Sequence, residues 1–487
     1  MKTVNFYQIL LIALGTFSGI YLGAIPGLSV TMAVSLLISF TYSWETYSAL
    51  ALMIGIYCGG VYGGSRSAIL LNIPGAPAAI ATTFDGYPLA KLGEAGTAIG
   101  ITTIQSVFGG LIGTAVLALA APLVSEIALM FAPRDYFLVA IMGLLLVGSL
   151  GKQSTAKGLF MAALGILLGM VGMDLLTGQP RFTFGSLNLM NGINYITAMI
   201  GLFGVSEALI QIKLKDMPIV KQKIDKIIPS WKTLIKLLPL SLRSAFIGVM
   251  VGALPGTGGD IAALIAYDNA KRTVKKPSRP FGEGAIEGLV APETANNSAI
   301  GGAFIPMLTL GIPGDPVTAI FIGALFIHGI KPGPMLMVET PELFWFIVVS
   351  LLIANVFLLI FGLTGVKIFT KLVEIPKDIL IPIIIVLSVI GTYTISNNIW
   401  DIYIMLIFGA LGYVLKSFDY PLGPLVLGMI LSPLLDTNFR RAVLTSGSLL
   451  GFLKDILSNP ISLILFGSII FMILSSTKGF KEIFSKK

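Results

Sequence analysis

The sequence has little cysteine, histidine or charge. Of its 487 residues, one is cysteine (Cys58), one is histidine (His328), and only 11% are charged. A single cysteine excludes an internal disulfide and a cysteine-based metal cluster. A single histidine disfavours a histidine-rich metal site and nucleophilic catalysis with a histidine base. Soluble domains carry about 25% charged residues, so this shortage of charge indicates a membrane protein.

Apolar residues and glycine are what the sequence has in abundance. Hydrophobic residues make up 55% of the chain, and 55 residues are glycine. A membrane-crossing helix needs about 20 apolar residues, and glycine lets such helices pack closely. The net charge of +8 gathers in segments between apolar runs, which is typical of cytoplasmic loops and not of nucleic-acid binding. We therefore expect an all-α polytopic membrane protein with about 10 to 14 crossings or half-crossings.

Two proline-glycine motifs occur in each half of the chain, inside apolar sequence. The first half contains Gly-Ala-Ile-Pro-Gly at 23–27 and Asn-Ile-Pro-Gly-Ala-Pro at 72–77. The second half contains Gly-Ala-Leu-Pro-Gly at 252–256 and Gly-Ile-Pro-Gly-Asp-Pro at 311–316. A helix broken inside the membrane frees backbone groups that lipid cannot satisfy, so such breaks line protein-enclosed cavities. Duplicated broken helices are typical of secondary transporters.

The distribution of basic residues predicts how the two halves are arranged. A lysine-rich segment, 213–236, is expected to be a cytoplasmic linker between a first transmembrane repeat, 1–212, and a second, 237–487. Residues 237–270 separate it from another basic cluster and are too few for two crossings, which predicts a re-entrant hairpin. Residues 3–65 contain no lysine or arginine, so the matching hairpin is expected to enter from the opposite side. The sequence thus predicts two inverted-topology repeats with re-entrant hairpins and broken helices.

The glycine-rich turn near residue 256 offers groups that suit both an anion and a cation. The half-helix that begins near Asp260 presents free amides, which favour a carboxylate. The half-helix that ends near Ala253 presents free carbonyls, which favour Na⁺. A tight turn between two packed helices is the alternative. The candidate substrate-binding residues here are Pro255, Gly256, Thr257 and Gly258, with Pro26 and Gly27 as their counterparts in the first half.

Neutral amide side chains beside the other breaks form a second group of candidates. Asparagine binds a carboxylate through N–H and a cation through oxygen, weakly enough for release during transport. Hydrogen bonding between helices is the alternative reading of these asparagines. The candidate substrate-binding residues of this group are Asn72, Pro74, Gly75, Asn296, Asn297, Pro313 and Gly314.

Ionisable residues inside apolar sequence are costly and therefore functional candidates. Ser65 and Arg66 are further candidate substrate-binding residues. Arg66 is expected either to contact a substrate carboxylate or to pair with Asp85. Asp260 either ligates a cation or caps its helix. The residues expected to hold a coupling Na⁺ are Gly256, Asp260, Asn297 and Thr309.

Three further ionisable positions keep two interpretations each. Glu287 and Glu293 either carry a coupling proton or form interfacial ion pairs. Asp315 either has a functional role or only caps the helix that follows it. His328 is expected at the membrane interface rather than in a proton pathway.

Longer motifs are spread over most of the chain. The first half contains YGGSRSAILLNIPG at 62–75, DGYPLA at 85–90 and GQPRFTFG at 178–185. The second half contains APETANN at 291–297, LTLGIPG at 308–314 and HGIKPGP at 328–334. These motifs resemble those of TctA, the large membrane subunit of the tripartite tricarboxylate transporters.

The resemblance implies a multi-pass permease of the cell inner membrane that imports tricarboxylates or dicarboxylates. It further implies Na⁺ or H⁺ coupling without another cofactor, a small membrane subunit and a periplasmic solute-binding protein. A homodimer is expected because moving transporters often use a fixed oligomeric scaffold. The alternatives are a passive channel or a structural subunit. A membrane-embedded enzyme is disfavoured, because one histidine and one cysteine supply neither a nucleophile–base pair nor a metal cluster.

Overall fold

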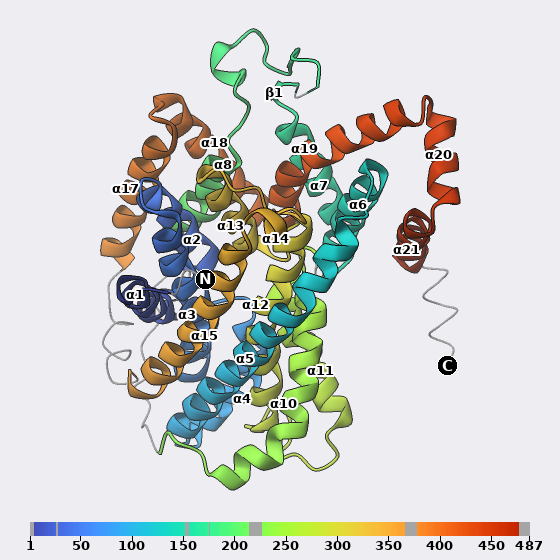
Figure 1. Ribbon diagram of the computed structural model, residues 1–487. Coiled ribbons are helices and arrows are strands. Elements are labelled where there is room, and N and C mark those ends of the chain that lie inside the picture. Colours follow the sequence, from blue (N-terminus) through green and yellow to red (C-terminus); the bar gives the residue numbers. More distant parts are fainter. Residues whose placement is uncertain are drawn as a thin grey trace.

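The computed structural model describes residues 4–25, 28–150, 155–174, 176–213, 226–365 and 377–476. Within these ranges the regular secondary structure is helical, except for a two-stranded antiparallel sheet of β1 (Gly172–Met173) and β2 (Pro180–Arg181). Eight of the described helices are long and apolar enough to cross a membrane, and a bent pair near the C-terminus makes a ninth candidate. The protein is therefore an all-α polytopic membrane protein, as predicted (Figure 1).

The first half alternates long and short helices. The Asn-Ile-Pro-Gly-Ala-Pro motif at 72–77 separates α3 from α4, and the loop around 25–29 separates α1 from α2. Pro26 and Gly27 lie outside the described residues. The helices are α1 (Phe6–Ala24), α2 (Val30–Thr41), α3 (Thr46–Leu71), α4 (Ala79–Lys91), α5 (Ala95–Ala128), α6 (Pro133–Leu150), α7 (Thr155–Gly169), η1 (Leu187–Leu189), α8 (Tyr195–Met199), the π-helical η2 (Ile200–Val205) and α9 (Ser206–Lys213).

The second half repeats this alternation. Breaks at 253–257 and 311–315 separate α10 from α11 and α12 from α13. The helices are α10 (Trp231–Gly252), α11 (Gly258–Thr273), α12 (Glu287–Leu310), α13 (Pro316–Ile327), α14 (Leu336–Glu339), α15 (Pro341–Thr364), α17 (Lys377–Ser396), α18 (Ile399–Ser417), α19 (Leu422–Thr445), α20 (Leu449–Ser458) and α21 (Pro460–Ser476).

The division into 1–212, 213–236 and 237–487 stays a prediction, as does the inverted, re-entrant topology. Residues 214–225 of the proposed linker lie outside the described ranges. α10 begins at Trp231, within that segment, and is long enough to cross a membrane. The pair α10–α11 therefore combines one full-length helix with one short helix.

Glycine lets the first and third helices of each half touch backbone to backbone. A methyl group on Gly19 of α1 would lie 2.5 Å from the Ile56 carbonyl oxygen of α3. In the second half, a methyl group on Gly252 of α10 would lie 2.4 Å from the Ala299 carbonyl oxygen of α12. The pair α10–α12 of the second half is thus packed in the same way as the pair α1–α3 of the first half.

The helices pack as two bundles. The central bundle contains α1, α3, α4, α5, α10, α11, α12 and α15. The flanking bundle combines two groups of helices, with α2, α8, η2, α9, α17 and α18 in one and α6, α7 and α19 in the other. The two groups meet where α19 contacts α8 and α18, and α13 packs against α2 of the first group and α19 of the second. α20 and α21 meet at a bend of 100° and stand at the edge of the molecule beside α6 (Figure 1).

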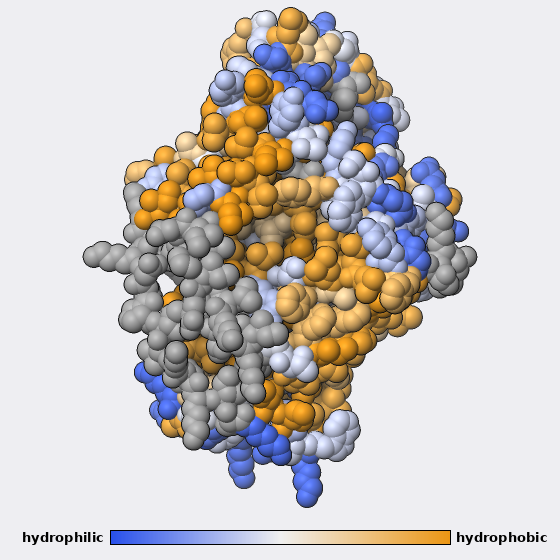
Figure 2. Space-filling view, turned by 90° about the vertical axis from the view of Figure 1, so that its left-hand side faces the viewer, coloured by the Kyte–Doolittle hydropathy of each residue, from blue (hydrophilic) through white to orange (hydrophobic). Residues whose placement is uncertain are grey.

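The outer surface is largely apolar. Figure 2 shows a broad hydrophobic surface on this face, with hydrophilic residues at the two ends of the molecule and along the upper part of its right-hand edge. A hydrocarbon layer about 30 Å thick covers such a surface in a membrane, while the polar ends face the headgroups and water.

Candidate functional site

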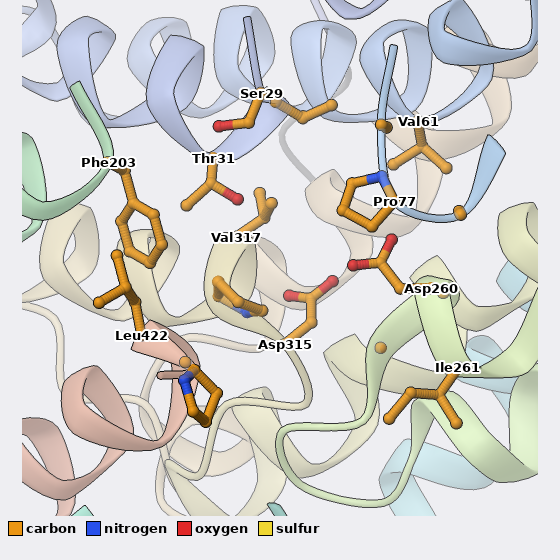
Figure 3. Close-up of a pocket in the computed structure, with 18 of the residues that line it drawn as sticks. Ser29, Thr31, Val61, Pro77, Phe203, Asp260, Ile261, Asp315, Val317 and Leu422 are labelled. Atoms are coloured by element: carbon orange, nitrogen blue, oxygen red, sulfur yellow. The ribbon is translucent and has the colours of Figure 1, made fainter. Parts of the chain in front are cut away.

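A cavity of about 730 Å³ lies where the two bundles meet (Figure 3). The central bundle lines it with Tyr57 and Val61 of α3, the break after α3, the break before α11, and part of α12. The flanking bundle lines it with parts of α2, η2, α9, α18 and α19, and α13 lines it with its first turn. All three of the predicted proline-glycine breaks that the structure describes in full therefore contribute to one cavity.

Five helices of the described chain begin at this cavity: α2, α4, α11, α13 and α19. The first amides of α4 donate to the carbonyls of residues 76–78. The first amides of a helix have no partner within the helix and carry partial positive charge. Ser29 caps α2 by accepting from the Met32 amide. Thr257 and Pro421, which precede α11 and α19, make no side-chain cap. The first turns of α11 and α19 therefore offer amides to an anion.

Two carboxylates, those of Asp260 and Asp315, point into the same cavity (Figure 3). Oδ1 of Asp315 accepts from the Thr318 amide at 2.7 Å, which caps α13. Oδ2 of Asp315 accepts from the buried Tyr57 hydroxyl of α3. Asp315 is thus an N-cap and also a wall of the cavity. The described residues contain no cluster of three or more His, Cys, Asp or Glu side chains, so a cation here would need carbonyl or hydroxyl oxygens as well.

Asn296 and Asn297 have different surroundings. Asn296 lines the cavity and donates from Nδ2 to the Val61 carbonyl at 3.3 Å. Its Oδ1 lies so close to Gly259 of α11 that a methyl group there would approach it to 2.2 Å. Asn297 instead donates to the Glu293 carbonyl at 3.0 Å, within its own helix. Asn296 therefore joins α3, α11 and α12 at the cavity wall.

The structure brings about half of the predicted site residues to this cavity. Those that line it are Pro74, Gly75, Gly256, Thr257, Gly258, Asp260 and Asn296. Those that do not are Ser65, Arg66, Asn72, Pro255, Asn297, Thr309, Pro313 and Gly314.

Arg66 is directed toward another helix. Its Nη2 donates to the Phe361 carbonyl at 3.2 Å and to the Gly362 carbonyl of α15 at 2.5 Å. Asp85, the alternative partner predicted for Arg66, accepts from the amides of Gly282, Gly284 and Ala285. Arg66 therefore ties α3 to α15.

Ser65 belongs to a buried cluster around Glu293. The Glu293 carboxylate accepts from the hydroxyls of Ser65 on α3, Thr82 on α4 and Ser106 on α5. All four side chains are at most 1% exposed. This hydroxyl cluster, defined by those four residues, joins four helices within the central bundle.

The other predicted positions make local contacts. The Thr309 hydroxyl donates to the Ile305 carbonyl of its own helix, and Asn72 is the left-handed C-cap of α3 with φ 58°. Glu287 accepts from the amide and hydroxyl of Ser278. His328 ends α13, half-buried and away from the cavity, and burial lowers its pKa although Glu45 opposes the shift.

Sequence reasoning missed several cavity residues. Tyr57 stands in an apolar run with no motif around it. Lys416 and Glu207 form an ion pair at 2.8 Å between Nζ and Oε2 at the cavity. The segment Pro-Leu-Gly-Pro at 421–424 also lines it. That segment is a further proline-glycine break, and its two prolines and glycine could have predicted it from the sequence.

Broken apolar helices around a cavity with both anion- and cation-binding groups define a class, the polytopic membrane transporters. The sequence profile of the tripartite tricarboxylate transporter TctA family matches residues 9–427, and the chain belongs to this family. It is thus a component of a tricarboxylate transporter.

Two relatives come from Agrobacterium vitis. One, described as the uncharacterized 52.8 kDa protein in the TAR-I ttuC' 3' region, is 38% identical over 451 residues, which cover 92% of this chain and 89% of the relative. The other, an uncharacterized protein in the TAR-II ttuC' 3' region, is 42% identical over 220 residues, covering 45% of this chain and 89% of the relative. No solved structure matches the chain.

Proposed function

We propose that this protein imports an organic anion with two or three carboxylate groups, together with a coupling cation, through the cavity between the bundles. The observation that carries the proposal is the meeting of five helix N-termini and the carboxylates of Asp260 and Asp315 at one cavity. Helix N-termini favour an anion, whereas carboxylates favour a cation. A site that holds both kinds of group suits a transporter that binds two ions of opposite charge.

The two ions are coupled by their charges in this proposal. The substrate carboxylates bind at the first turns of α11 and α19, next to Thr257 and Pro421. The cation binds near Asp260 and Asp315, with carbonyl oxygens of the Gly256 turn. Without the cation, the two aspartates repel the anionic substrate, so substrate affinity depends on cation concentration. Either Na⁺ or H⁺ fits this scheme.

The remaining parts of the proposal follow from family membership. We place the protein in the cell inner membrane, as a homodimer, with a small membrane subunit and a periplasmic solute-binding protein that delivers the substrate. A passive channel is the alternative, and counterflow in liposomes separates the two, because only a carrier shows stimulation by unlabelled substrate on the opposite side.

The test is thermal unfolding of the purified protein with mono-, di- and tricarboxylates, with and without Na⁺ and over a range of pH. A ligand at 100 times its Kd stabilises the folded state by about 2.7 kcal/mol. We expect this stabilisation for one class of carboxylate, and only with the coupling cation. Asp260→Asn should abolish the cation dependence, because it removes one of the cavity carboxylates.

Asp268→Asn is the matched control. Asp268 lies on the same helix, at the surface, where it pairs with Arg272 at 2.7 Å. This variant should respond to the carboxylate and the cation as the wild type does. Equal responses of Asp260→Asn and the wild type would contradict the proposed cation site, and an absence of any carboxylate response would contradict direct substrate binding by this subunit.

A further inference from the structure

A second, smaller pocket lies outside the transport cavity, between the start of α10 and the end of α11. Its volume is about 260 Å³. Three cationic side chains line it: Lys236 and Arg243 of α10, and Lys276 in the segment after α11. We call it the basic pocket.

The basic pocket carries a net positive charge. Lys236 and Arg243 are seven residues apart on α10 and therefore share one helix face. Glu287 is the acidic residue of the lining, and its Oε2 is held by the amide and hydroxyl of Ser278 at 2.9 and 2.7 Å. Among the described residues, none forms an ion pair with Lys236, Arg243 or Lys276. The pocket therefore attracts an anion.

Arg243 shows that an acceptor is missing. Its Nε is enclosed by protein and has no hydrogen-bond partner among the residues that the structure describes. A buried donor without an acceptor costs about 1–3 kcal/mol. A guanidinium matches the geometry of a phosphate, which can accept two parallel hydrogen bonds from it. An oxyanion in the basic pocket would satisfy this donor.

The surroundings of the pocket fix the kind of anion. Beside the pocket, α10 carries an exposed apolar stripe at four-residue spacing: Leu238, Leu242, Phe246 and Met250. Trp231, 74% exposed, begins the helix, and tryptophan is typical of the membrane interface. Trp231 thus indicates headgroup depth for the start of α10, the end of the helix that carries Lys236, and the apolar stripe leads away from there along the helix.

We propose that the basic pocket binds the phosphate headgroup of an anionic phospholipid, with the acyl chains along the α10 stripe. Basic pockets between membrane helices are suited to such headgroups. Inorganic phosphate shares the headgroup chemistry but does not use the stripe. A bound lipid would hold the start of α10, the helix that leads into the Gly256 turn, at a fixed depth in the membrane.

The test is a titration of the delipidated, full-length protein with phosphatidylglycerol in detergent, followed by thermal unfolding and by native mass spectrometry. Phosphatidylcholine and inorganic phosphate serve as separate arms. We expect phosphatidylglycerol alone to raise the unfolding temperature and to remain bound in the mass spectrum. Each cation near a membrane surface contributes a factor of about five to the binding of an anionic lipid. Arg243→Gln combined with Lys276→Gln should therefore weaken binding at least about ten-fold.

Arg272→Gln is the matched control, because it removes one charge from the same end of α11 outside the pocket. It should bind phosphatidylglycerol as the wild type does. Lys276 is exposed, so Lys276→Gln alone keeps the test possible if the double variant fails to fold. Unchanged binding in these pocket variants would overturn the proposal, and so would an equal effect of inorganic phosphate. Neither result bears on carboxylate transport.

Discussion

At the residue scale, the close packing of α1 on α3 depends on positions that carry no side chain. Gly19→Ala would place a methyl group 2.5 Å from the Ile56 carbonyl oxygen and 2.8 Å from its Cα. Backbone atoms of a packed helix cannot give way easily, so we expect a destabilisation of about 1–3 kcal/mol. Thermal unfolding of the purified variant measures it.

Gly467→Ala in α21 provides the comparison. A methyl group there meets no atom within 4 Å, and alanine has the higher helix propensity by about 1 kcal/mol. This variant should be as stable as the wild type or more stable. Equal stabilities of Gly19→Ala and Gly467→Ala would contradict the close backbone contact of α1 with α3.

Individual site residues were the part of the structure least accessible from sequence. Asn296 and Asn297 are chemically identical neighbours. Asn296 nevertheless lines the cavity, whereas Asn297 donates a hydrogen bond to a carbonyl of its own helix. Their difference is a rotation of about 100° around the helix axis, which depends on how α12 packs between α5, α10 and α11. The prediction for Arg66 likewise rested on the rule that a buried charge marks a functional site. In the structure, however, its Nη2 donates to two backbone carbonyls of α15.

At the scale of elements, the hydroxyl cluster joins α3, α4 and α5 to α12. Glu293→Ala would remove the acceptor of three buried hydroxyls and leave a void, and we expect a loss of about 3 kcal/mol or more in unfolding free energy. Glu293→Gln keeps one oxygen for Ser65 and Thr82, and its amide group can donate to Ser106. It should lose clearly less stability in the same thermal assay. Equal losses would show that the negative charge, rather than the acceptor geometry, holds the cluster.

Breaks in helices were predictable where proline and glycine interrupt apolar sequence. The breaks at 72–77, 252–256 and 311–316 separate helices as expected. Proline has no backbone N–H to donate to a helical hydrogen bond, and glycine adopts the backbone angles that a turn requires. The break at 421–424 was not predicted, because its prolines and glycine stand at the start of the apolar stretch 421–435 and not inside one. The bend of 100° at Asn459–Pro460 was not predicted either.

The β1–β2 hairpin is an element held by charge. Asp174 forms ion pairs with Arg181 and Arg440, and Arg181 pairs with Asp436 of α19 at 2.9 Å. Desolvation opposes ionisation of Asp174, but the amides of Thr177 and Leu176 and the two guanidiniums outweigh it and hold its pKa well below the usual range. The hairpin thus stays attached to α19 throughout the pH range in which the thermal assays are made.

At the scale of the whole molecule, the cavity lies between two bundles, so a relative movement of the bundles would open it to either side of the membrane. Gly143 of α6 and Pro255 of the central bundle face each other across this boundary, and a methyl group on Gly143 would lie 3.2 Å from the Pro255 Cβ. That separation is close to the 3.5–4.5 Å of a disulfide. We expect Gly143→Cys with Pro255→Cys, in a Cys58→Ala background, to cross-link on oxidation and to block carboxylate uptake by cells with the complete transport system.

Reduction should restore uptake, and each single cysteine variant should transport with or without oxidant. Cys58 is the one cysteine of the sequence, so Cys58→Ala leaves the two introduced cysteines as the only thiols. Full uptake by a completely cross-linked protein would show that α6 and the Gly256 turn keep their separation during transport.

The cavity draws its walls from almost the entire length of the chain, from Ser29 to Pro424. During synthesis the lining segments are made one after another, and the segment 421–424 is made after all the others. A chain that ends before residue 421 therefore lacks part of the cavity wall. A gene interrupted upstream of codon 421 encodes a protein that lacks one wall, and a cell that inserts such a fragment gains no functional carrier from it.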